Sequence, residues 1–135
     1  MIYRDFGKTG IRVSVLGFGC MRLPMMEKDG TSMVNDELAT PLLQRAVELG
    51  INFFDSHWFY CNFDSQRAVG AALRPLRDKV YISSKIMTNM IKKPEDFIDY
   101  LKRSLDAMEL EYMDFYHFPA LSQMIGLCFL ERNRF

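Results

Sequence analysis

The chain has 135 residues, within the usual size of one domain, and 49% of them are hydrophobic while 25% are charged. This composition excludes an intrinsically disordered protein, and the length suffices to bury a hydrophobic core. The 17 basic and 17 acidic residues cancel, so no positive field would recruit a nucleic acid or an anionic membrane surface.

The sequence contains no recognisable targeting or redox signal. The start, MIYRDFGKTG, lacks the apolar region of a signal peptide, and no apolar run reaches the ~18 residues of a membrane span. Cys20, Cys61 and Cys128 are scattered and odd in number, and they indicate no disulfide framework and no metal site. We therefore expect a cytoplasmic protein.

The first predicted element is a β-hairpin. Residues 2–6 and 11–16 are two short β-like runs, and the turn-type segment Gly-Lys-Thr-Gly at 7–10 joins them. Gly-Phe-Gly-Cys at 17–20 extends the second run into a further strand. A polar loop is expected from about residue 25 to 35.

A helical rhythm follows this loop. Thr40 and Pro41 suit an N-cap and a first turn, although the helix could begin as early as Asn35. Gly50 suits the position just past its end. The apolar residues that fall on one face of this helix are Leu42, Leu43, Ala46 and Val47.

Strands and helices then alternate. Short strands are predicted at 51–54, 80–85 and 112–118, with a helix capped by Ser65 and a helix opened by Pro94 between them. This alternation predicts βαβ units and a parallel sheet. The apolar faces of the two helices are Ala68, Val69, Ala72 and Leu73 in the first and Phe97, Ile98, Leu101, Leu105 and Met108 in the second.

The spacing of the strands favours a barrel. The strand ends at Asp55, Lys85 and His117 are 30 and 32 residues apart. Neither GxGxxG after the first strand nor GxxxxGK[ST] occurs, so a doubly wound dinucleotide-binding domain is the weaker alternative. A (β/α)8 barrel needs ~250 residues. The predicted fold is therefore α/β, with an N-terminal β-hairpin followed by the first about four βα units of a TIM barrel, which remains incomplete.

Four titratable side chains are expected at the carboxyl ends of the predicted strands, where parallel α/β folds place their chemistry. They are Asp55, Lys85, His117 and Tyr60, the last on the loop after Asp55. A lysine ammonium stabilises the phenolate form of a neighbouring tyrosine, and a carboxylate can hold that ammonium in place. Tyr60 would then donate a proton to a carbonyl oxygen that is reduced by hydride, and the hydride would require a nicotinamide cofactor.

Each of these residues also has a purely structural interpretation. Asp55 could cap the loop that follows it, Tyr60 could be a packed aromatic residue, and Lys85 could be a solvated lysine. His117 lies in an aromatic stretch, where a hydrogen-bonded core histidine is common. His57 is interpreted as a pocket wall or a surface residue. The pattern alone leaves both interpretations open.

Longer segments of the sequence, over residues 3–121, resemble the aldo-keto reductase family. The stretch YRDFGKTGIRVSVLGFGCMRLP is similar to the family's opening hairpin and first barrel strand. GINFFDSHWFYCNFDSQRAVGAAL resembles the motif in which a strand-end Asp precedes the catalytic Tyr by five residues. VYISSK looks like the strand that ends in the catalytic Lys, and SLDAMELEYMDFYHF like the helix and strand that lead to the family's His.

The resemblance implies a (β/α)8 barrel that reduces aldehydes and ketones with NADPH or NADH. It makes Tyr60 the proton donor, Lys85 the residue that tunes it, and Asp55 the partner of Lys85. Asp55 also matches a position that touches the cofactor's ribose. The residues that match the end of the first strand, where the nicotinamide approaches, are Gly19, Cys20 and Met21.

The sequence departs from the family pattern at several positions. Cys61 and Asn62 follow the Tyr where Gly is usual, and Gln66 stands where Glu is typical. The family's His falls on Pro119, so His117, two positions earlier on the same face of the strand, is the candidate for its role. The opening resembles the longer family members with a C-terminal iron–sulfur cysteine cluster, but the sequence contains no such cluster.

The end of the sequence matches nothing expected after the fourth strand. We therefore interpret residues 1–121 as a partial aldo-keto reductase barrel and 122–135 as an unmatched tail. Half a barrel has two open strand edges, which favours self-association or a complementing half-barrel besides the small carbonyl substrate. We expect no cofactor-dependent carbonyl reduction by the isolated chain. The alternative function is a truncated, non-catalytic remnant or a cofactor-binding or regulatory subunit.

Overall fold

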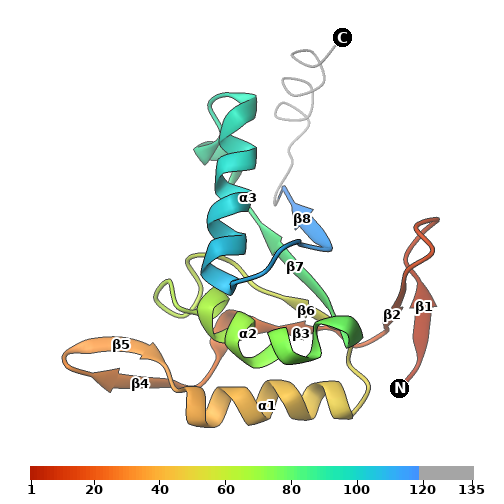
Figure 1. The fold of residues 1–135 in the computed structure, drawn as a ribbon, viewed down its shortest axis with the longest axis horizontal. Coiled ribbons are helices and arrows are strands. Elements are labelled where there is room, and N and C mark those ends of the chain that lie inside the picture. Colours follow the sequence, from red (N-terminus) through yellow and green to blue (C-terminus); the bar gives the residue numbers. More distant parts are fainter. Residues whose placement is uncertain (119–135) are drawn as a thin grey trace.

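The computed structural model describes residues 1–118 (Figure 1). Its first element is an antiparallel hairpin of β1 (Tyr3–Asp5) and β2 (Arg12–Ser14). Gly7 and Gly10 in the turn both have positive φ, which glycine adopts without the strain that a Cβ would cause. The predicted N-terminal hairpin is therefore confirmed.

Four parallel strands form the central sheet in the order β3-β6-β7-β8. Their order in space equals their order in the chain, as in the first part of a (β/α)8 barrel. The α/β class and the partial barrel are confirmed, and β3 and β8 are the edge strands of this sheet in the described part of the chain. The strands are β3 (Phe18–Gly19), β6 (Phe53–Asp55), β7 (Tyr81–Lys85) and β8 (Phe115–His117).

Three α-helices pack against one face of this sheet, and α2 contacts both α1 and α3 (Figure 1). Short 3-10 helices follow β3, α2 and β7. The α-helices are α1 (Asp36–Glu48), α2 (Ser65–Leu73) and α3 (Pro94–Met108), and the 3-10 helices are η1 (Cys20–Arg22), η2 (Arg74–Lys79) and η3 (Thr88–Met90). No helix among residues 1–118 combines the length and the apolar character needed to cross a membrane.

The ends of the helices agree with the sequence to within a residue or choose between its alternatives. Asn35 is the N-cap of α1, so the earlier of the two predicted starts is correct and Pro41 lies inside the helix. Gly50 follows the end of α1 with a φ of 91°, as predicted. Asp64, not Ser65, is the N-cap of α2, while α3 begins at Pro94 as predicted.

The segment predicted as a polar loop at 25–35 is instead a second antiparallel hairpin. It consists of β4 (Met25–Lys28) and β5 (Thr31–Val34), and it protrudes from the body of the molecule (Figure 1). Asp29 and Gly30 join the strands, and both have positive φ, which fits the two-residue turns that match strand twist. The prediction failed because β4 is exposed throughout and lacks the alternation of a half-buried strand, although Asp-Gly is a known hairpin signal.

The hydrophobic core lies between the sheet and the helices. Phe54 of β6 and Ile82 of β7 are fully buried together with residues of α1 and α2. The whole predicted face of α2 is buried, as is Met108 at the end of α3. Ile98, predicted on the apolar face of α3, is instead 47% exposed, because α2 packs only against the later turns of α3. Helices α2 and α3 come into close contact at Gly70, where an added Cβ would clash with the backbone of Met108.

The opposite face of the sheet, the inner face of the barrel segment, separates apolar and polar residues along the strands. Phe6 from the β1–β2 turn packs on Phe53 and Phe115, with ring centroids 6.3 and 4.6 Å apart. The N-terminal hairpin therefore covers the amino-terminal end of this face. Asp55 and Lys85 lie two or more residues further along their strands, so the polar side chains collect at the carboxyl end.

Candidate active site

The strand register brings the predicted site residues together at the carboxyl end of the sheet. Gly19 pairs with Asp55, Asp55 pairs with Ser83, and Lys85 pairs with His117. In a parallel sheet, paired residues point to the same face, and so do residues two apart on a strand. Side chains separated by about thirty residues in the sequence therefore share the carboxyl end of the inner face.

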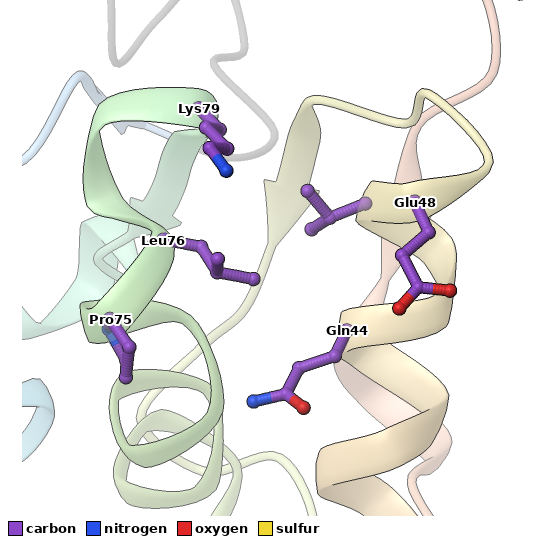
Figure 2. Close-up of a pocket in the computed structure, with 6 residues that line it drawn as sticks. Gln44, Glu48, Pro75, Leu76 and Lys79 are labelled. Atoms are coloured by element: carbon purple, nitrogen blue, oxygen red, sulfur yellow. The ribbon is translucent and has the colours of Figure 1, made fainter.

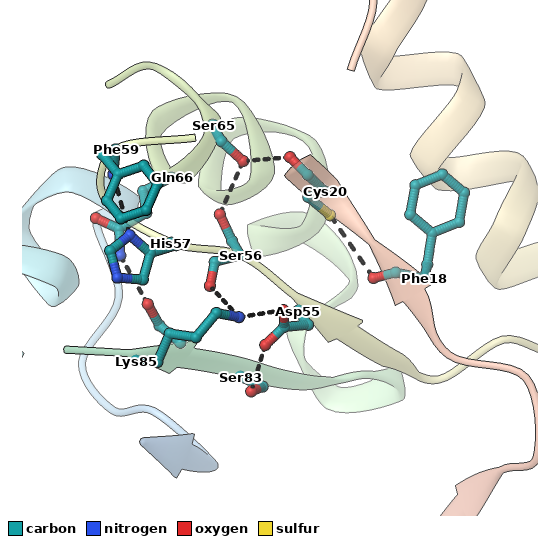
Figure 3. A network of polar contacts seen from close by, with 11 residues as sticks. Phe18, Cys20, Asp55, Ser56, His57, Phe59, Ser65, Gln66, Ser83 and Lys85 are labelled. Carbon is teal, nitrogen blue, oxygen red and sulfur yellow. Dashed lines mark hydrogen bonds and ion pairs between the residues drawn. The ribbon is translucent and has the colours of Figure 1, made fainter. Parts of the chain in front are cut away.

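Asp55 and Lys85 form a partly buried ion pair between neighbouring strands (Figure 3). The exposed fractions of the side chains are 32% for Asp55 and 17% for Lys85. Asp55 Oδ1 also accepts a hydrogen bond from Ser83 Oγ at 2.9 Å, and Lys85 Nζ lies 3.4 Å from the carbonyl oxygen of Ser56. The ammonium is thus fixed by a carboxylate and a carbonyl, as the sequence predicted for Asp55 and Lys85.

Tyr60 lies on the loop between β6 and α2, where its half-buried ring faces the lysine. Lys85 Nζ is 5.2 Å from the ring centroid, within the range of a cation–π contact. The ring centroid of His57 is 5.3 Å from that of Tyr60. Asp55, Lys85 and Tyr60 therefore converge, which their positions in the sequence alone left open.

His117 occupies the same rim but does not join this group through a side-chain contact in the described part of the chain. It is exposed, and its ring lies parallel to that of Phe115, with centroids 6.2 Å apart. Its backbone pairs with that of Lys85. Pro119, which stands at the position of the family's His, lies outside the described residues.

His57 is not a surface residue, because only 1% of it is exposed. Its Nδ1 accepts the backbone N–H of Phe59 at 3.2 Å, so Nε2 carries the proton of the neutral ring. Burial, followed by the positive charge of Lys85, lowers the pKa of His57 to about 4, against the opposing effect of Asp55. His57 is therefore an uncharged residue behind Tyr60.

Besides Asp55, the three predicted cofactor-binding residues at the end of the first strand have different environments. Gly19 is exposed beside Asp55, and an added Cβ would meet nothing within 4 Å, so the inner face is open there. Cys20 is fully buried, burial raises the pKa of its thiol, and its carbonyl oxygen accepts a hydrogen bond from Ser65 Oγ at 2.8 Å. Met21 is 52% exposed. Gly19 and Met21 thus remain accessible, while the side chain of Cys20 belongs to the core.

Several buried polar residues lie between the carboxyl ends of the strands and α2, and they support the site from the helix side (Figure 3). The sequence did not single them out for the site. Ser56 Oγ and Ser65 Oγ are 2.8 Å apart, which links the end of β6 to the start of α2. Gln66 Nε2 donates to Ser84 Oγ at 2.9 Å, and both residues are buried. The two adjacent serines in VYISSK are the feature of the sequence that could have indicated these polar contacts. Ser83 faces Asp55, whereas Ser84 faces α2.

A family model of the aldo/keto reductase family matches residues 15–121, most of the chain. The chain belongs to the aldo/keto reductase family. This result agrees with the resemblance found in the sequence, and the described part of the fold agrees with the barrel architecture of solved family members.

Known aldo-keto reductases align with this chain over part of their own length. L-galactose dehydrogenase of Arabidopsis thaliana is 30% identical over an alignment of 136 positions, which covers 91% of this chain and 41% of that protein. The holo form of an aldo-keto reductase from Bacillus halodurans is 26% identical with a TM-score of 0.71, covering 86% of this chain and 39% of that structure. The chain therefore spans about two fifths of the length of these relatives.

A more distant structure shows the shared fold alone. An aldo-keto reductase from Klebsiella pneumoniae, solved in complex with NADPH, is 22% identical with a TM-score of 0.69. It covers 87% of this chain, while the chain covers 39% of it. The half-barrel of this chain thus superimposes on the corresponding part of a protein with a quite different sequence.

A groove on the other side of the molecule is separate from this site. It lies between the end of α1 and η2 and is lined by Gln44, Val47, Glu48, Pro75, Leu76 and Lys79 (Figure 2). These elements lead into the amino-terminal ends of β6 and β7, whereas Asp55 and Lys85 lie at the carboxyl ends. Among residues 1–118, no group of three or more His, Cys, Asp or Glu side chains could hold a metal ion.

Proposed function

We propose that this chain carries the proton-donating part of an NAD(P)H-dependent carbonyl reductase site, with Tyr60 as the proton donor to an aldehyde or ketone. The observation that carries the proposal is the placement of Lys85 Nζ against both the Asp55 carboxylate and the Tyr60 ring. Membership of the aldo/keto reductase family supports the same reaction type. The substrate would be a small carbonyl compound.

The chemistry follows from the charges of these three side chains. A carbonyl that accepts hydride develops negative charge on its oxygen, and a phenol that donates its proton there becomes a phenolate. The Lys85 ammonium stabilises that phenolate, and Asp55 keeps the ammonium in place. His117, on the neighbouring strand, is proposed to help orient the carbonyl group from the same rim.

The surface around Gly19, at the carboxyl end of the strands, fits a nicotinamide cofactor. Gly19 presents bare backbone beside Asp55, with free space where a Cβ would stand, so a flat ring could lie close to β3. We propose Gly19, Met21 and the backbone of Cys20 as contacts of the nicotinamide, and Asp55 as a contact of the ribose. Bound NADPH or NADH would supply the hydride that no side chain can supply.

The test of this function follows the absorbance of NADPH in the presence of a panel of aldehydes and ketones. It uses the 135-residue chain alone and mixed with the second half of the Bacillus halodurans barrel, which would pair with the edge strands β3 and β8. We expect no consumption by the chain alone and consumption by the mixture. Tyr60→Phe should lower it at least ~100-fold, because it removes the proton donor.

A matched control separates loss of the hydroxyl from loss of structure. Tyr112→Phe removes the hydroxyl of an exposed tyrosine whose ring stacks on Arg77, and it should leave the rate unchanged. Consumption that survives Tyr60→Phe would refute Tyr60 as the donor. Calorimetric binding of NADPH without consumption in the mixture would instead support the alternative of a non-catalytic cofactor-binding subunit.

A further inference from the structure

The loop that carries Tyr60 continues into a left-handed turn. Residues 61–63 have φ angles of 51°, 55° and 69°, a region that residues with a Cβ disfavour. The turn folds back on Tyr60, because the N–H groups of Asp64 and Ser65 both donate to its carbonyl oxygen, at 3.2 and 3.1 Å. Three successive non-glycine residues remain in such a conformation only where surrounding contacts hold them.

The β4–β5 hairpin and the segment that precedes it supply such contacts. Cys61 Sγ accepts the N–H of Leu23 at 3.4 Å and donates to the carbonyl oxygen of Met21 at 3.4 Å. Asn62 Nδ2 donates to the carbonyl oxygen of Ser32 in β5 at 3.0 Å. Both residues that directly follow Tyr60 are therefore bonded to backbone about 30 to 40 residues earlier in the chain.

Asp64 ties the end of the turn to the same hairpin. Its Oδ2 accepts the N–H of Val34 at 2.8 Å, and its Oδ1 accepts Arg67 Nε at 2.6 Å. Arg67 also donates to Asp36 at the start of α1. Burial acts to raise the pKa of Asp64, but Arg67 and the Val34 N–H outweigh it and hold that pKa below its ordinary value. The carboxylate is therefore charged and accepts from both partners.

We propose that the β4–β5 hairpin and the segment just before it, residues 21–23, form a brace that positions Tyr60, with Cys61 and Asn62 as the positioning residues. This inference rests on the proposed role of Tyr60 as proton donor. The ring of Tyr60 is in contact with His57 and Lys85, and its backbone is held by the turn. The hairpin is bonded to Asn62 and the segment before it is bonded to Cys61, and together they restrict the phenol to the geometry needed for proton transfer.

The test compares glycine with serine at Cys61 in the full chain. Cys61→Gly removes the thiol contacts but suits the positive φ, whereas Cys61→Ser keeps a side chain that donates and accepts. NMR records the NOE between the Tyr60 ring and the Lys85 side chain, and the exchange of the Asp64 and Ser65 amides. We expect Cys61→Gly combined with Asn62→Gly to lose the NOE and to exchange both amides ~10-fold faster, while Cys61→Ser retains both signals.

Asp29→Gly is the matched control, because Asp29 lies at the tip of the same hairpin with a φ of 51°. It should leave the NOE and the exchange unchanged. Retention of both signals in the double glycine variant would overturn the brace. If that variant does not fold, Asn62→Gly alone carries the test with the same two readouts and the same outcomes.

Kinetic measurements on the mixture of this chain with the second half of the Bacillus halodurans barrel separate this inference from the proposed function. A loosened Tyr60 should lower kcat ~10-fold and leave the KM for NADPH unchanged, because the misplaced phenol acts in the transition state. Cys61→Ser should restore the rate. Tyr60→Phe should abolish reduction without changing the amide exchange. If the parent chain shows slow exchange of the Asp64 and Ser65 amides but the mixture does not consume NADPH, the result would contradict the proposed function and not the positioning role of Cys61 and Asn62.

Discussion

Two histidines close to strand ends in the chain have opposite environments in the fold. His57 is buried beside Tyr60 and held by the Phe59 N–H, whereas His117 is exposed at the edge strand β8. The difference arises because the chain after β6 turns inward into the aromatic loop, while β8 has no further strand beside it in the described part. Burial, followed by the nearby positive charge of Lys85, keeps the imidazole of His57 uncharged at neutral pH.

His57 should make the stability of the protein depend on pH. Its pKa is about 4 in the folded state, below the ordinary value of 6.5, so between these values the unfolded chain binds a proton that the folded chain does not. Stability is therefore complete above the higher value and declines as the pH falls toward the lower one. We expect the free energy of unfolding to be about 2 kcal/mol smaller at a pH midway in this window than at neutral pH.

Urea unfolding at several pH values measures this effect. His57→Asn retains an acceptor for the Phe59 N–H but cannot titrate, so its unfolding free energy should vary less with pH across the window. His117→Asn, at the exposed histidine, should keep the pH dependence of the parent chain. An equal dependence in His57→Asn and in the parent would show that other groups cause it.

Among the elements of the fold, a largely buried ion pair connects neighbouring βα units. Arg77 in η2 pairs with Asp114 just before β8, and their side chains are only 14% and 12% exposed. Asp114 Oδ2 also accepts the N–H of Ile82 in β7 at 2.8 Å, and Arg77 donates to the carbonyl oxygen of Val80. One carboxylate thus holds the 3-10 helix and two strands together.

Asp114→Asn should therefore destabilise the fold by about 3 kcal/mol, because it leaves the Arg77 guanidinium buried without its counter-charge. Chemical denaturation measures the change. Glu109→Gln is the matched control, since Glu109 pairs with Arg74 at the surface with side chains 71% and 48% exposed, and it should cost less than about 1 kcal/mol. Equal losses in the two variants would contradict the role assigned to burial.

At the scale of the whole molecule, the sheet of the described chain has two edges. Exposed apolar residues precede β3 at one of them, where Val15 is 62% and Leu16 is 59% exposed. Open edges with apolar neighbours favour pairing with other chains. The same edges would pair with further strands in a closed barrel, whose relatives are more than twice as long as this chain.

We expect the purified chain to self-associate in a concentration-dependent manner, as measured by analytical ultracentrifugation. Leu16→Lys places a charge beside the β3 edge and should shift the equilibrium toward the monomer. Leu38→Lys is the matched control, because Leu38 is 57% exposed on α1, away from the sheet edges, and it should leave the association unchanged. A chain that remains monomeric at all concentrations would contradict this prediction.

Patterns in the sequence were enough to predict the alternating strands and helices of the βα units, the parallel sheet and the positions of Asp55, Tyr60 and Lys85 at or just after strand ends. Apolar periodicity, glycine and proline signals and the spacing of strand-end residues are local, and the strand register converts that spacing into proximity. The sequence also named the residues of family motifs, and the functional roles of all of these residues remain predictions.

Which side chains meet across the fold became clear from the three-dimensional arrangement of the elements. The β4–β5 hairpin was missed because its residues gain their order from partners such as Asp64, which bonds Val34 from 30 residues away. The burial of His57 and the Arg77–Asp114 pair likewise depend on contacts between distant elements. Local patterns record the preference of a segment for one conformation, whereas hydrogen bonds and burial depend on neighbours that the chain acquires only when it folds.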